Sequence, residues 1–276
     1  PFIGASGVTH PLLAEAATQF QAQAFKELLP SDGPVRCQVV GAESKETIQQ
    51  ANRVRDYMNY QITDVMEEYT PEMDQMLFFL PLAGSTFKKV YYDPAAQRCK
   101  ATFIHAEDLV VPYNASDLYE AERISEVQRV TKNTVAKRIA SGFYRDVELP
   151  EPFFNEDRAQ KKYQELEGVT PQKYQDLYNF VEMHVDLDLP GYESNDGVKV
   201  PYIVTLDRDS MTIMSIYRNY KPDDPSRKRI PYFVHYKFLP GLGFYGFGLI
   251  HMIGGLSKAA TGALRQLLDA GTLANL

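Results

Sequence analysis

The chain has 276 residues, of which 44% are hydrophobic and 24% charged, as is usual for a folded protein with a sizeable core. Its formal net charge is −7, from 29 basic and 36 acidic residues, which argues against a domain that grips nucleic acid by many phosphate contacts. Cys37 and Cys99 lack CxxC spacing, so they predict neither a disulfide framework nor a zinc site and are expected to be reduced structural thiols.

Residues 1–147 are expected to form a mixed α/β domain. Apolar residues recur at helical spacing in its longer stretches and alternate with polar ones in the shorter stretches. Thr70 and Pro71 are typical of a helix start, and Gly142 is typical of the residue that follows a helix. In chain order, the expected elements are a helix at 12–29, a strand at 35–40, helices at 45–68 and 70–84, a hairpin of strands 86–92 and 99–105, strands at 109–113 and 124–131, and a helix at 133–141.

Residues 148–175 are polar and charged, which predicts a linker that carries a solvated helix. The segment 176–189 then alternates strictly between two sets of side chains, as a strand does. We expect it to open a four-stranded antiparallel meander, so that 176–240 forms a second, β-rich unit. The other three expected strands are 198–206, 211–218 and 230–239. The predicted fold class is therefore α+β.

The last stretch, 241–276, is a glycine-rich turn followed by one long helix. No capping residue follows Leu276, and the chain begins at Pro1 rather than at Met. We therefore expect an internal piece of a larger protein, whose last helix packs against something outside the chain.

The glycine-rich turn also matches a nucleotide-binding pattern. Gly241, Gly243 and Gly246 have GxGxxG spacing, follow a predicted strand and open a helix. The pattern normally lies in a parallel βαβ unit with an acidic residue ending the second strand, whereas here the strands are antiparallel and Asp269 lies inside the helix. A nucleotide-binding enzyme is the alternative hypothesis; no phosphate loop of the GxxxxGK[ST] type occurs.

Two further patterns predict no site. Glu182, His184 and Asp186 share one strand face and have metal-binding side chains, but a solvated polar face has the same pattern and is favoured. The uncharged run 238–257 has the length of a membrane span, yet Pro240 and the glycines weaken its helical character. We predict no metal, no cofactor, no catalytic residues and no membrane partner.

The last helix has two distinctive sets of residues. A polar stripe lies on one face and comprises His251, Lys258, Thr261, Arg265 and Asp269. Gly254, Gly255 and Gly262 are small, and each glycine inside a helix costs about 1 kcal/mol relative to alanine. A helix that tolerates such losses is expected to have a close neighbour, although an ordinary core helix of its own domain stays open.

Segments spread over nearly the whole chain carry a resemblance to a known family. They are PGLGFYGFGLIHMIGGLSKAATGALRQLLDAGTLANL at 240–276, PYIV at 201–204, RNY at 218–220, RVRDYMNYQIT at 53–63, GSTFKKVYYD at 84–93, EDLVVPY at 107–113 and SGFYRDVELP at 141–150. In these segments the chain resembles the portal protein, or head-to-tail connector, of tailed double-stranded DNA bacteriophages.

The resemblance implies a non-enzymatic ring, typically of twelve subunits, at one capsid vertex of the virion, assembled in the host cytoplasm. DNA would pass through it without sequence specificity, and its protein partners would be the terminase large subunit, the major capsid or scaffold protein and a tail adaptor. By segment, 1–147 would be the outer wing, 148–175 the approach to the stem, 176–240 the clip region and 241–276 a truncated stem helix.

The resemblance and the residue patterns together give candidate interaction residues. Lys258 and Arg265 are the candidates for bases that face the DNA tunnel. Gly254, Gly255 and Gly262 are the candidates for subunit packing. The cluster Arg227, Lys228 and Arg229 is the candidate contact with the motor, the adaptor or DNA. An ordinary solvated surface charge is an equally open interpretation for each of these bases.

Overall fold

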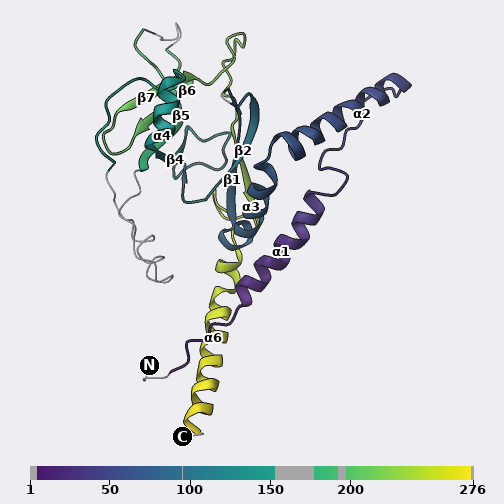
Figure 1. Ribbon diagram of the computed structural model, residues 1–276, viewed down its shortest axis with the longest axis vertical. Helices are drawn as coiled ribbons and strands as arrows, with labels where there is room; N and C mark the ends of the chain where they lie inside the picture. Colours follow the sequence, from purple (N-terminus) through teal and green to yellow (C-terminus); the bar gives the residue numbers. More distant parts are fainter. Residues whose placement is uncertain (1–4, 95, 153–176, 192–196, 275–276) are drawn as a thin grey trace. The chain divides into compact units, whose positions relative to one another are not determined.

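The computed structural model describes residues 5–94, 96–152, 177–191 and 197–274. Their contacts divide the chain into two compact units. The first combines residues up to Ala106 with those from Tyr232 onward, and the second is Glu107–Pro231. The fold class is α+β, as predicted, with helices and antiparallel sheets (Figure 1). Most of the expected linker, 153–175, lies outside the described residues.

The first unit is built on a three-stranded antiparallel sheet with strand order β2-β1-β8. The predicted hairpin is confirmed, with Phe87 opposite Ile104 and Asp93 opposite Arg98. The elements of this unit are α1 (Leu12–Leu28), α2 (Lys45–Tyr60), the π-helical turn η1 (Gln61–Val65), α3 (Tyr69–Ala83), β1 (Ser85–Asp93), β2 (Arg98–Ile104), β8 (Phe233–Lys237) and α6 (Leu249–Ala274).

Helix α3 supplies the core of this unit. Its residues Met73, Met76 and Leu77 are buried, and Phe20 of α1 and Phe103 of β2 pack against them. The helix ends at Gly84, which has a φ of 83° and donates its N–H to the carbonyl of Leu80. Such a left-handed residue lets the chain turn directly into β1.

Lys88 of β1 is a charged residue inside this core. It is 2% exposed, and its Nζ lies 4.3 Å from the ring centre of Tyr69 on α3. The Nζ has no hydrogen-bond partner among the described residues. Burial lowers the pKa of Lys88 to about 8, against the opposing influence of the Glu72 carboxylate.

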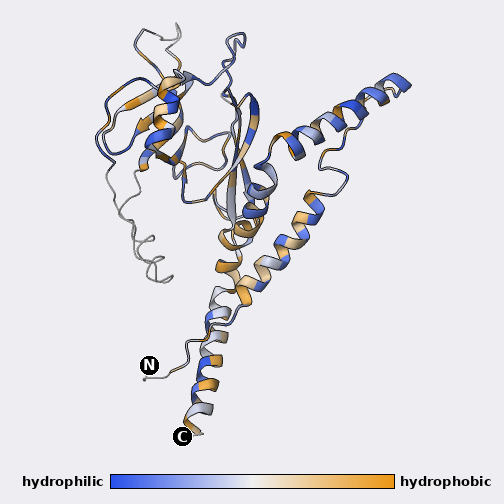
Figure 2. Cartoon of the chain, viewed as in Figure 1, coloured by the Kyte–Doolittle hydropathy of each residue, from blue (hydrophilic) through white to orange (hydrophobic). Residues whose placement is uncertain are grey.

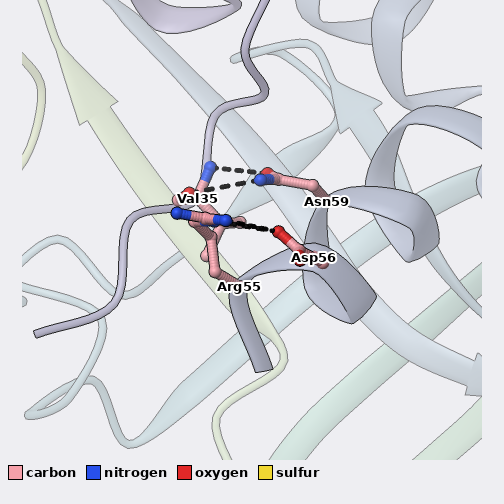
Figure 3. A network of polar contacts seen from close by, with 4 residues as sticks. All are labelled: Val35, Arg55, Asp56 and Asn59. Atoms are coloured by element: carbon pink, nitrogen blue, oxygen red, sulfur yellow. Dashed lines mark hydrogen bonds and ion pairs between the residues drawn. The ribbon is translucent and has the colours of Figure 1, made fainter. Parts of the chain in front are cut away.

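The expected strand 35–40 is wrong: these residues form no strand, and the first of them, Val35, binds a helix. The Asn59 side chain of α2 accepts a hydrogen bond from the backbone N–H of Val35 at 2.8 Å and donates one to its carbonyl at 3.3 Å (Figure 3). Arg55 and Asp56 form an ion pair beside it. Asn59 thus supplies the hydrogen bonds that a neighbouring strand would otherwise make.

The second unit contains a five-stranded antiparallel sheet with strand order β3-β4-β5-β6-β7. Three strands of the predicted meander, β5, β6 and β7, pair in sequence order. The fourth neighbour is β4 rather than β8, because β8 pairs with β1 in the first unit. The elements of this unit are β3 (Leu109–Val110), β4 (Arg123–Thr131), α4 (Lys132–Ala140), β5 (Leu177–Leu187), β6 (Val200–Asp207) and β7 (Ile213–Arg218).

These strand pairings explain why the compact units differ from the expected division at 147 and 176–240. β4 joins the second unit by pairing with β5, and β8 joins the first. Helix α4 begins at the cap Thr131, whose side chain accepts from the N–H of Thr134, and it is followed by Gly142 at a φ of 74°, as expected.

Candidate interaction surface on helix α6

The glycine-rich turn before α6 packs backbone against backbone. A Cβ atom on Gly246 or Gly248 would lie under 3.0 Å from backbone atoms, including those of Gly84 at the end of α3. A Cβ on Gly241 would collide in the same way with the carbonyl of Tyr245. Two glycines of the GxGxxG pattern, Gly241 and Gly246, are therefore required by the chain's own packing.

A buried serine and a half-buried histidine hold this turn against the sheet. Ser85 accepts a hydrogen bond from the N–H of Gly246 at 2.8 Å, and its Oγ lies 3.0 Å from the Nε2 of His235. The imidazole stacks on Phe87 and Phe244, with ring centres 4.4 and 4.7 Å away. Burial and the nearby Lys237 lower the pKa of His235 to about 4, so the ring is neutral at pH 7 and can accept the Ser85 proton.

The predicted polar stripe of α6 contacts the segment 6–10, which runs beside the helix (Figure 1). Asp269 accepts a hydrogen bond from the backbone N–H of Ser6 at 2.7 Å. Thr261 accepts one from the N–H of His10 at 3.1 Å. Two residues of the stripe thus bind the two ends of the segment.

Arg265 binds the middle of the same segment. Its Nε donates to the carbonyl of Val8 at 2.6 Å, and one terminal nitrogen lies 3.3 Å from both the carbonyl of Gly7 and the Oγ1 of Thr9. The guanidinium expected to face a tunnel is therefore engaged within its own chain. Lys258 is exposed and makes no hydrogen bond or ion pair with any described residue.

A second face of α6 is apolar except for Gln266 and is uncovered by the described residues. Its members alternate at spacings of four and three and are all exposed: Met252, Leu256, Ala259, Ala263, Gln266, Ala270 and Leu273. We call this set the apolar ladder. Leu256 is 65% exposed and Leu273 is 58% exposed. Figure 2 shows orange and white segments along α6, in contrast to the mostly blue α2. A four-three spacing is the pattern by which helices pack along a shared seam.

The three candidate glycines of α6 differ in their surroundings. A Cβ on Gly254 would lie 3.9 Å from the Cγ2 of Ile250 on the same helix. A Cβ on Gly255 or Gly262 would meet nothing within 4 Å. No described part of the chain requires glycine at these two positions, which border the apolar ladder on one side.

The three residues of the basic cluster, Arg227, Lys228 and Arg229, also differ in their contacts. Arg229 donates to the carbonyl of Ala121 at 2.6 Å and to the carboxylate of Asp186 at 2.9 Å. Arg227 and Lys228 are exposed, and Arg227 has a positive φ of 47°. Arg229 therefore holds its own unit together, and only Arg227 and Lys228 remain exposed to meet a partner.

The polar face of β5 is partly buried, contrary to the expectation of a solvated face. His184 is 1% exposed, with its Nε2 2.9 Å from a Glu182 oxygen and its Nδ1 3.2 Å from the Asn219 amide nitrogen. Gln128 of β4 donates to the other Glu182 oxygen at 3.2 Å. These bonds link Gln128, Glu182, His184 and Asn219 in one hydrogen-bond network, whose histidine is buried.

Two kinds of site are absent from the described part of the chain. No group of three His, Cys, Asp or Glu side chains there is arranged to hold a metal ion. No described helix combines the length and the apolar character needed to cross a membrane.

The chain was compared with protein-family models and with curated proteins. No protein-family model matches this chain, and no curated protein is significantly similar to it.

Proposed function

We propose that this chain is part of a portal protein subunit, which forms a ring at one capsid vertex of a tailed double-stranded DNA bacteriophage. The observation that carries the proposal is the apolar ladder of α6, together with the resemblance of the chain's segments to that family. The described residues leave this face bare over a helix of 26 residues. Exposed faces of that kind mark interaction sites.

The composition of the ladder favours another helix as its partner. Ala259, Ala263 and Ala270 are small, which lets two helix backbones approach closely, and the larger Met252 and Leu256 lie at one end. The seam has no charged residue, so a second copy can face it without burying an unpaired charge. A helix from a neighbouring copy of this chain fits these properties.

In this proposal the ring is a conduit and not an enzyme. Terminase supplies the ATP hydrolysis, and DNA passes without sequence-specific contact during packaging and ejection. The chain's net charge of −7 supports this, because a net negative charge opposes the retention of DNA. Lys258 is the base of α6 that remains available to face the channel.

The other partners follow from the resemblance. Arg227 and Lys228 are candidates for contact with the terminase large subunit or a tail adaptor. The major capsid or scaffold protein would hold the ring in place, and the particle would assemble in the host cytoplasm. A ring of about twelve subunits is expected from the family pattern.

The proposal is tested by the native mass of the protein, with negative-stain images of the same sample. We expect rings of about twelve subunits with a central hole. A monodisperse monomer or dimer, with or without scaffold protein in the sample, contradicts the proposal.

A further inference from the structure

We infer that residues 6–10 form an intramolecular strap that clamps the polar stripe of α6 and fixes the rotation of that helix on its own unit. The strap concerns contacts inside one chain. It is independent of whether the chain assembles into a ring, and it assigns to Arg265 a clamping role rather than a role in binding DNA.

The strap and the helix match in length. Thr261, Arg265 and Asp269 follow one another at intervals of four residues, so they form one row of about 12 Å along the helix at 1.5 Å per residue. An extended segment covers about 13 Å in the four steps from Ser6 to His10. The two run in opposite directions, because Ser6 lies at Asp269 and His10 lies at Thr261.

The chemistry of the row also fits an extended backbone. A strand outside a sheet has N–H and C=O groups that lack partners. The row offers an acceptor, a donor and an acceptor in turn. Asp269 accepts from the N–H of Ser6, and Thr261 accepts from the N–H of His10. Between them, Arg265 donates to the carbonyls of Gly7 and Val8. Except for the bond to the Thr9 hydroxyl, every contact is to the main chain of the strap.

The position of the row explains what the strap does for the helix. Arg265 lies six residues from Ala259 of the apolar ladder, which places it roughly 120° around the helix axis. With the row held against the strap, the ladder points away from it. The strap therefore determines which side of α6 remains exposed.

The test compares Arg265→Ala with Lys258→Ala. Both variants remove one positive charge from α6, but only Arg265 contacts the strap. Hydrogen–deuterium exchange, followed by mass spectrometry on peptides that cover 5–20, reads the strap directly. We expect Arg265→Ala to speed exchange at Ser6 and His10 roughly tenfold and Lys258→Ala to leave it unchanged.

Peptides from β1 and β2 show whether each variant is folded, and Arg265→Lys gives a second, milder variant. It keeps the charge but loses the planar fork, so it should give an intermediate exchange rate. Equal exchange of the 5–20 peptides in the wild type and Arg265→Ala, with an intact sheet, would overturn the strap. That result would leave the ring proposal standing, whereas native masses without rings would leave the strap standing.

Discussion

Lys88 has an unfavourable position at neutral pH, because its ammonium group lies inside the core of the first unit. Its pKa falls from 10.5 to about 8 on folding, so between these values the unfolded chain binds the proton and the folded chain does not. Stability therefore rises with pH across this window. We expect Lys88→Met to stabilise the protein at pH 7 by about 2 kcal/mol and to remove this rise.

Urea unfolding at pH 7 and at pH 10 measures both effects, with Lys258→Met as a control for the loss of an exposed lysine. A destabilised Lys88→Met protein at both pH values would show that the Tyr69 contact outweighs the cost of burial.

The lowered pKa of His235 leads us to expect that the folded protein loses stability in acid. Its pKa lies at about 4 in the folded chain, below the usual 6.5, so the folded state resists protonation. The stability it contributes is present above pH 6.5 and is lost as the pH falls towards 4. His235→Phe should flatten the dependence of Tm on pH in this window, at a cost of about 1 kcal/mol at pH 7 from the lost Ser85 bond.

Thermal unfolding between pH 4 and 7.5 checks this expectation, and His105→Phe serves as the matched variant in the same unit. If His235→Phe keeps the full acid sensitivity of the wild type, the histidine between Phe87 and Phe244 is not its source.

At the scale of the elements, Gly255 and Gly262 allow a test that separates the single chain from its assembly. In the chain alone a Cβ atom at either position meets nothing within 4 Å, and leucine is the better helix former. Gly255→Leu and Gly262→Leu should therefore stabilise the monomer by up to about 1 kcal/mol each. If a second copy packs closely here, the same variants should abolish the ring.

Native mass and urea unfolding of the same samples report both properties. Lys258→Leu is the matched control, since it adds a leucine to α6 without replacing a glycine. Normal rings from both glycine variants would show that no neighbour approaches α6 at these positions.

The elements that could be predicted from the sequence are those marked by a pattern within a short stretch of chain. Apolar spacing located α1, α3 and α6, and the polar turn at Asp93 located the β1–β2 hairpin. The partner of a strand is not a local property. β8 has the pattern of a meander strand, yet it pairs with β1. Residues 35–40 have a strand pattern but join no sheet, and Val35 binds Asn59 instead.

The candidate site shows the same limit. The stripe and the small residues of α6 can be read from their spacing, because a helix fixes which residues share a face. Spacing does not show which other part of the chain covers each face. The contact of Arg265 with Val8 joins residues 257 positions apart, and no periodicity predicts it. His184 likewise looks like a surface residue until Asn219 is placed beside it.

At the scale of the whole molecule, the chain leaves the first unit at Ala106 and returns to it at Tyr232. The second unit is thus an insertion between the two outer strands of the three-stranded sheet, β2 and β8. Removing it would leave two chain ends to be rejoined, at β2 and β8, which flank β1 on either side.

The insertion also sets an order of events during synthesis. Ser85 and His235 are 150 residues apart, so β1 can pair with β8 only after the residues between them have been synthesised. The second unit, being continuous, can fold in that interval. The strap binds α6 later still, because Thr261 and Asp269 follow β8 in the chain.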